Sequence, residues 1–120
     1  MNSPAGFAGR QSIYNVAFRD DQELFRAYMP FVKNGGLFTT THNRVPLGQP
    51  VFMLVTLPGS SEKLPVSGKV VWLTPVGAQG NRPAGIGVQF DDTPEGHQAR
   101  NRIESLLAGK LQSDKATYTM

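Results

Sequence analysis

The stretch LPVSGKVVWLTPVGAQGNRPAGIGVQF, residues 64–90, carries the clearest strand pattern of the chain. Two sets of side chains alternate through its first half, which predicts one long strand with a bend or bulge at Gly68. A glycine-rich loop follows, and GIGVQF, residues 85–90, predicts a second strand. Alternate residues of the long strand are expected to lie on the same face of the sheet. One such set is Val66, Gly68, Val70 and Trp72.

Further strand patterns precede this stretch. Tyr14, Val16 and Phe18 alternate with other residues and predict a strand that starts near Ile13. A second strand, LFTTT, begins at Leu37, and the segment LGQPVFMLVTLP, residues 47–58, is apolar on both faces, as in a central strand. Five strands with hairpin-length connections favour an antiparallel barrel or sandwich.

Two helices are predicted between and after the strands. Asp20 and Asp21 offer an N-cap and an acidic first turn for a short helix that ends before Pro30. Thr93 and Pro94 are typical of the start of a second helix. The apolar positions of this second, amphipathic helix recur at helical spacing: Ala99, Ile103, Leu106, Leu107 and Leu111.

The length of 120 residues suits one compact domain. We expect this domain at residues 13–111, between flexible tails at residues 1–12 and 112–120. The longest apolar run, Val51–Leu57, is too short to span a bilayer, and no signal peptide is visible. A soluble cytoplasmic protein without direct membrane insertion is therefore expected.

The charge and the residue types exclude several classes of function. Lys+Arg 12 against Asp+Glu 9 gives a net charge of +3. Because the basic residues are scattered along the chain and form no stripe, nucleic acid is not an expected partner. The count of Cys 0 excludes disulfides, thiol nucleophiles and zinc–thiolate sites.

No motif typical of an enzyme is present. His42 and His97 have no further ligand at metal-binding spacing, and no GxSxG elbow occurs. The glycine-rich loop lacks the GK[ST] ending of a phosphate-binding loop, and Asp91–Asp92 follows a strand, where capping explains it. We therefore expect a protein that is not an enzyme and that holds no cofactor and no metal.

Large aromatic residues are the candidates for protein binding. Phe25 and Tyr28 on the short helix and Trp72 on the long strand either pack in the core or form exposed anchors. The working hypothesis is that these three side chains form one apolar patch that binds a protein partner. The C-terminal tail is expected to add a short docking element that orders on contact. This element consists of Tyr118, Thr119 and Met120.

Three blocks of the sequence are long and distinctive. They are AYMPFVKNGGLF, GKVVWLTPVGAQGNR and GIGVQFDD, in this order, followed by one helix and a tail that ends in TM. Through these blocks the chain resembles the PilZ domain family from about Ile13 to Met120, and in particular its stand-alone members in type IV pilus assembly. The resemblance implies a mainly β protein, a six-stranded antiparallel β-barrel with a C-terminal helix. The short N-terminal helix predicted above is added to that barrel.

Most members of that family bind the second messenger cyclic di-GMP through an RxxxR motif and a [D/N]xSxxG motif. With the glycine of the second motif on Gly36, its acidic position falls on Phe31 and its serine on Lys33. In the first motif, Glu23 stands where an arginine should follow Arg19, and a carboxylate there would repel the phosphate groups of the ligand. The glycines of MPFVKNGGLF, residues 29–38, are therefore expected to form a turn and not a ligand cradle.

The resemblance implies an adaptor that does not bind cyclic di-GMP directly. Its partners would be PilB, the motor ATPase of pilus extension, and FimX, a sensor of cyclic di-GMP with degenerate GGDEF and EAL domains, in pilus biogenesis and twitching motility. The alternative is a direct receptor with a non-standard arrangement of arginines. These arginines would be Arg10, Arg19, Arg26 or Arg44. A small nucleic-acid-binding barrel has only the basic pI in its favour.

Overall fold

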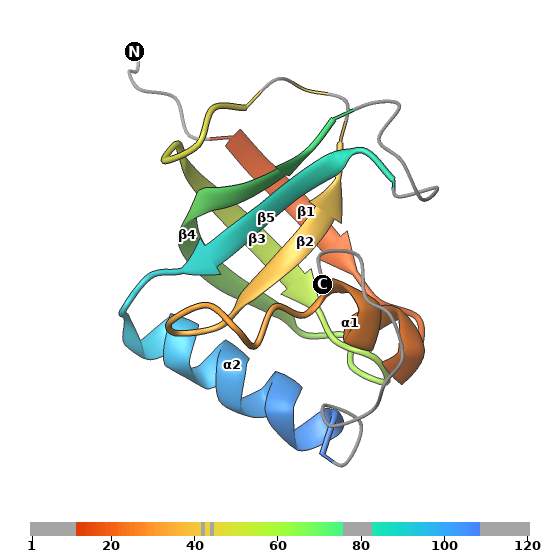
Figure 1. Cartoon of the computed structure of the whole chain (residues 1–120). Coiled ribbons are helices and arrows are strands. Elements are labelled where there is room, and N and C mark those ends of the chain that lie inside the picture. Colours follow the sequence, from red (N-terminus) through yellow and green to blue (C-terminus); the bar gives the residue numbers. More distant parts are fainter. Residues whose placement is uncertain (1–11, 42, 44, 76–82, 109–120) are drawn as a thin grey trace.

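The computed structural model describes residues 12–41, 43, 45–75 and 83–108 (Figure 1). These residues form a strongly curved sheet with one helix across its lower end and a shorter helix beside it (Figure 1). The elements in chain order are β1 (Ser12–Ala17), α1 (Asp21–Ala27), β2 (Gly36–Thr40), β3 (Pro50–Thr56), β4 (Lys63–Thr74), β5 (Gly85–Phe90) and α2 (Pro94–Leu106).

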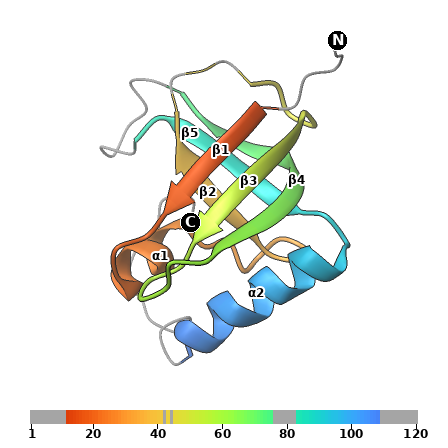
Figure 2. The ribbon, with the colours of Figure 1, turned by 180° about the vertical axis from the view of Figure 1, so that it is seen from behind.

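The sheet has five strands in the order β1-β3-β4-β5-β2. The expectation of six antiparallel strands is therefore wrong for the described residues. Three neighbouring pairs are antiparallel, but β1 runs parallel to β3, side by side in the view from behind (Figure 2). A parallel pair needs a long connection, and α1 and β2 supply it.

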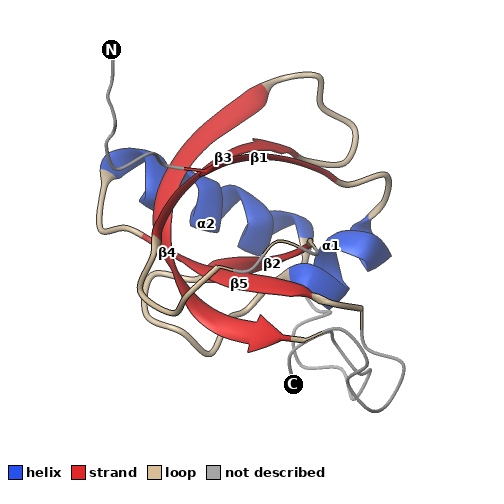
Figure 3. Ribbon diagram, turned by 90° about the horizontal axis from the view of Figure 1, so that it is seen from above, coloured by secondary structure: helices blue, strands red, loops and turns tan. Residues whose placement is uncertain are grey.

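The long strand β4 bends round and joins the two sides of the sheet into a half-barrel (Figure 3). The prediction that β3 is central is confirmed, since β3 lies between β1 and β4. Alternate side chains of the strands fill the inside of the curve. Those of β3, β4 and β5 that are almost fully buried are Val51, Met53, Val55, Val66, Val70, Ile86, Val88 and Phe90.

The two helices start where the sequence predicts. The Asp20 side chain accepts a hydrogen bond from the Glu23 N–H at 2.9 Å, and the Thr93 hydroxyl accepts one from the Gly96 N–H at 3.0 Å. Each bond satisfies a backbone donor that the first helical turn leaves unpaired. Helix α2 packs against β4 and buries Ile103 in the core.

The predicted domain starts one residue later than the first strand, and its predicted C-terminal end lies outside the described residues. Ser12, assigned to the N-terminal tail, already belongs to β1. Helix α2 ends at Leu106, and Leu111, predicted to continue its apolar face, lies outside the described residues. Within the described part of the chain, neither helix has the length and apolar character needed to cross a membrane.

A bulge in β4 decides the position of Trp72. Val70 lies opposite Val88, but the register then shifts, so that Trp72 and not Val71 lies opposite Gly87. Without this extra residue Trp72 would lie opposite Ile86 and point into the half-barrel, as the alternating pattern predicts. The bulge therefore lies at Val71 and not at Gly68, and it moves Trp72 to the outer face.

Candidate protein-binding site

The segment between α1 and β2 is a tight turn that folds back on itself. Its base is closed by a bridge between Tyr28 and Leu37 and by a hydrogen bond from the Met29 N–H to the Gly36 carbonyl at 2.9 Å. At its tip Asn34 and Gly35 have φ angles of 68° and 77°. Such left-handed geometry favours asparagine and glycine. The prediction that this segment forms a turn is confirmed.

The glycine after the tip serves close packing between two strands. A Cβ atom on Gly36 would lie 2.5 Å from the Val88 carbonyl oxygen on β5. Only glycine lets β2 approach β5 this closely without a shift of the backbone. Gly36 thus has a structural reason to be glycine that involves no ligand.

The turn places Met29 on the outer face of β5. Ile86 and Val88 point into the half-barrel, so Gly87 between them faces outward. A Cβ atom on Gly87 would lie 2.7 Å from the Met29 sulfur and 2.7 Å from the Trp72 Cβ. The missing side chain of Gly87 therefore creates the space in which Met29 and Trp72 pack on the outer face.

Phe31 and Trp72 form an aromatic pair above this layer. Their ring centroids are 6.5 Å apart and the rings make an angle of 63°, an edge-to-face arrangement. The Trp72 indole Nε1–H donates a hydrogen bond to the Thr74 hydroxyl at 2.8 Å, which fixes the orientation of the ring. Phe31 is 45% exposed and Trp72 is half-buried, so the pair offers a rigid apolar surface to solvent.

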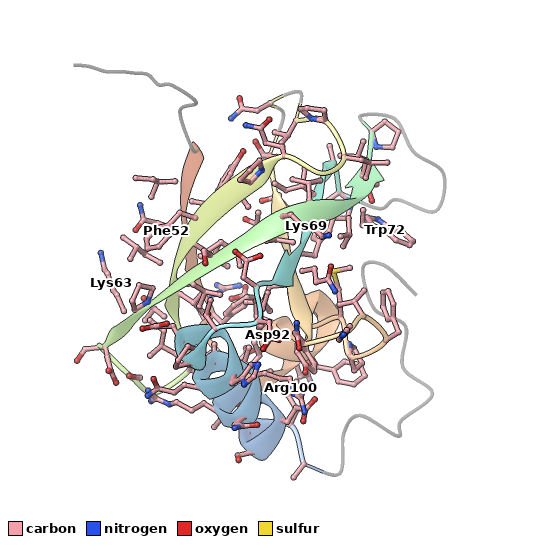
Figure 4. All side chains as sticks on the ribbon, turned by 90° about the vertical axis from the view of Figure 1, so that its left-hand side faces the viewer. Phe52, Lys63, Lys69, Trp72, Asp92 and Arg100 are labelled. Carbon is pink, nitrogen blue, oxygen red and sulfur yellow. The ribbon has the colours of Figure 1, made fainter. Side chains whose placement is uncertain are left out.

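Polar groups border the aromatic pair. Gln89 on β5 donates a hydrogen bond from its side-chain amide to the Lys33 carbonyl at 2.8 Å. Lys69 lies directly opposite Gln89 across the β4–β5 ladder. Figure 4 shows Lys69 and Trp72 near each other on β4. We call this set the aromatic–lysine surface: Phe31, Lys33, Lys69, Trp72 and Gln89.

The aromatic patch expected from the sequence is only partly present. Phe25 is 7% exposed and Tyr28 is 1% exposed, so both belong to the core and cannot be exposed anchors. The curved sheet and the two helices cover both side chains, which helical spacing alone did not reveal. Trp72 is the member that reaches the outer surface. Tyr118, Thr119 and Met120 lie outside the described residues, and their binding role stays a prediction.

Phe31 was missed as a binding residue. One signal was available, because Phe31 lies between a proline and a double glycine and belongs to no helical or strand periodicity. Its contact partner Trp72 is distant in sequence, however, and only the fold brings the two rings together.

Tyr28 connects the turn to helix α2. Its hydroxyl donates a hydrogen bond to Glu104 Oε2 at 2.6 Å, and Arg100 lies at ion-pair distance from the same carboxylate, 4.0 Å from Nε. Burial is the main cause that raises the pKa of Tyr28 well above that of a free phenol, and the hydrogen bond to Glu104 and its negative charge add to it. Tyr28 is therefore a neutral donor that holds the base of the turn against α2.

Tyr28→Phe is expected to lower the free energy of unfolding by about 1–2 kcal/mol, because it removes a hydrogen bond to a charged group. The raised pKa means that the unfolded chain loses this proton first as the pH rises. Stability from this group is thus complete below about pH 10 and falls above it in the native chain, and less so in the variant. Urea unfolding at neutral and alkaline pH measures both effects.

Tyr14→Phe is the matched control. The Tyr14 hydroxyl is buried and finds no hydrogen-bond partner among the described residues. Its removal should therefore leave stability unchanged or slightly increase it at neutral pH. If the two variants lose equal stability there, the Tyr28–Glu104 bond contributes nothing specific.

The positions of the family's arginine motif hold an internal ion pair. The Glu23 carboxylate accepts the Arg19 backbone N–H at 2.8 Å and pairs with the Arg19 guanidinium at 3.3 Å. Glu23 thus stands where the motif needs a second arginine, and it pairs with the first one, Arg19. Of the other candidate arginines, Arg10 and Arg44 lie outside the described residues. No group of three or more potential metal ligands occurs in the described ranges.

Comparison with known proteins gives one family. A family model described as the PilZ domain matches residues 12–109, a range that includes all seven helices and strands of the described residues. Among curated proteins no match to the chain was found.

Proposed function

The chain belongs to the PilZ domain family, and from this membership we propose that it is a non-enzymatic adaptor in type IV pilus biogenesis and twitching motility. In this proposal it acts in the cytoplasm as the stand-alone PilZ proteins of pilus assembly do. It links the extension ATPase PilB to the cyclic di-GMP sensor FimX and does not bind the nucleotide itself. The family includes receptors for cyclic di-GMP as well as adaptors, so the choice rests on the site.

The observation that carries the proposal is the replacement of the family's nucleotide-binding groups by groups of other chemistry. Where the second motif has its acidic residue, Phe31 exposes an aromatic ring and packs against Trp72. Where the first motif has its second arginine, Glu23 pairs with Arg19. The phosphodiester groups of cyclic di-GMP suit forked cationic donors, and its guanine edges require polar partners. An exposed aromatic pair suits an apolar side chain of a protein.

Calorimetric titration with cyclic di-GMP tests the proposal. We expect no heat of binding from the native chain, while pull-downs with purified PilB-type and FimX-type proteins should retain it. A direct receptor would instead show saturable heat, and that result together with failed pull-downs would reject the adaptor.

A matched variant tests whether the two motifs determine the binding of cyclic di-GMP in this titration. Glu23→Arg, Phe31→Asp and Lys33→Ser together restore both family patterns, with Arg19 and Gly36 already in place. This triple variant should bind cyclic di-GMP more tightly than the native chain, because it regains two cationic forks and a polar contact. If the native chain binds as well as the triple variant, the lost motifs do not determine nucleotide binding.

A further inference from the structure

Two lysines border the Phe31–Trp72 pair on the outer face of the sheet. Lys69 is the cross-strand neighbour of Gln89, and the Gln89 amide holds the Lys33 carbonyl at 2.8 Å. Both lysine side chains are exposed. Both lysines therefore neighbour Gln89, Lys69 across the ladder and Lys33 through its backbone carbonyl, and belong to the aromatic–lysine surface.

Neither ammonium group has an acidic partner among the described residues. Ion pairs and close contacts in that part of the chain include Arg19 with Glu23, His97 with Asp92, Arg100 with Glu104, and Arg102 with Glu62. Asp91, the acidic residue that directly follows β5, is not within ion-pair distance of either lysine. The surface thus combines an apolar centre with uncompensated positive charge.

The apolar centre is held rigidly before any partner binds. The Thr74 hydroxyl fixes the Trp72 ring, and the closed turn fixes the position of Phe31. A preorganised surface loses little side-chain entropy on binding, so contacts to it contribute more to affinity. Positive charge at the border of such a centre selects partners of opposite sign and speeds their association.

We infer that the segment recognised by the aromatic–lysine surface is an acidic peptide segment of a partner protein. One apolar side chain of this segment packs on Phe31 and Trp72, and carboxylates on either side of it pair with Lys33 and Lys69. The inference rests on the proposed adaptor function and adds to it the chemistry of the partner.

A nucleotide fits the same surface less well. Lysine ammonium groups are point charges without the forked geometry of arginine, and they do not read a base edge. The one amide on the surface, Gln89, already donates to the Lys33 carbonyl. A flexible acidic segment, in contrast, can adjust its carboxylates to two separate ammonium groups.

Selection from a random-peptide phage library tests this inference without any assumed partner. The immobilised chains are the native protein, the Lys33→Glu/Lys69→Glu variant and the control Lys63→Glu. Lys63 is also exposed, has no ion pair among the described residues, and lies at the start of β4, whereas Lys69 lies in the middle of that strand (Figure 4). It therefore reports the effect of charge reversal away from the surface.

We expect the native chain and the control to select peptides with Asp or Glu on both sides of an apolar residue. Synthetic copies of these peptides should bind the double variant about tenfold more weakly, and more weakly at high salt. Should the double variant fail to fold, Lys33→Gln/Lys69→Gln is used, with a smaller loss expected. In the native chain, the peptides should shift the NMR signals of Phe31 and Trp72.

Three results would overturn the inference: no enrichment on the native chain, enrichment without acidic residues, or equal binding by the native and double-variant chains. Cyclic di-GMP is titrated in parallel, and binding that the double variant loses would assign the lysines to a nucleotide instead. Because PilB-type and FimX-type proteins are absent from this experiment, its failure is distinct from failure of the pull-downs that test the adaptor.

Discussion

Trp72→Ala is expected to weaken binding to the PilB-type or FimX-type partner by about thirtyfold, the loss typical of a tryptophan at an interface hot spot of about 2 kcal/mol. The substitution removes one ring of the exposed pair and leaves Phe31 without its edge-to-face neighbour. Calorimetry with the purified partner gives the affinity, and circular dichroism shows whether the domain is folded.

Trp72 is half-buried and packs against the core cluster, so its removal lowers stability as well as binding. Two further variants separate these effects. Phe31→Ala removes only a ring that is 45% exposed, and it should weaken binding at little cost in stability. Ile13→Ala is the matched control, because Ile13 on β1 is a larger exposed apolar surface, 64% exposed, outside the aromatic–lysine surface.

The hypothesis of an aromatic anchor predicts how the affinity of each of these variants changes. Folded Phe31→Ala and Trp72→Ala chains must both lose affinity, while Ile13→Ala keeps it. Native affinity in the first two, or an equal loss in all three, would show that the partner binds elsewhere. The binding site would then have to be sought on another face of the domain.

Ile103→Ala should lower the free energy of unfolding by about 2–5 kcal/mol, the range for an isoleucine truncated in a packed core. Ile103 is 0% exposed and belongs to the same core cluster as the inner strand residues. Its loss leaves a cavity between α2 and the end of the half-barrel that α2 covers. Urea denaturation followed by circular dichroism measures the change.

Leu106→Ala is the control for this second prediction. Leu106 lies on the same helix but is 37% exposed, so its truncation removes less buried surface and should cost clearly less than Ile103→Ala. Equal losses would mean that helix formation itself, and not packing of α2 against the sheet, determines the stability. A small loss for both would mean that the domain is stable without α2.

Local features of the structure could be predicted from the sequence. The N-caps Asp20 and Thr93 were identified correctly because a cap depends on a side chain and on backbone groups two or three residues away. The turn was expected from the double glycine Gly35–Gly36, because glycine accepts a positive φ, and Gly35 has a φ of 77°. The central place of β3 followed from its two apolar faces, since an edge strand rarely has both.

Features that depend on distant partners could not be predicted. Tyr28 was placed in the hypothetical binding patch, yet it is 1% exposed, and its hydroxyl donates a hydrogen bond to Glu104, 76 residues further along the chain. The parallel pairing of β1 with β3 was also missed. Short connections favoured antiparallel neighbours, but the pairing depends on which strand edges meet in space.

By itself the sequence determined the PilZ family, the mainly β class, the two helices and the loss of both nucleotide-binding motifs, because each of these depends on residue types at short spacing. Only the tertiary structure decided which face carries Trp72. Strict alternation places it inside, and a single extra residue at Val71 turns it outward, where the gap above Gly87 accepts it. A bulge arises from the register between two strands, and register is a property of their packing and not of either strand alone.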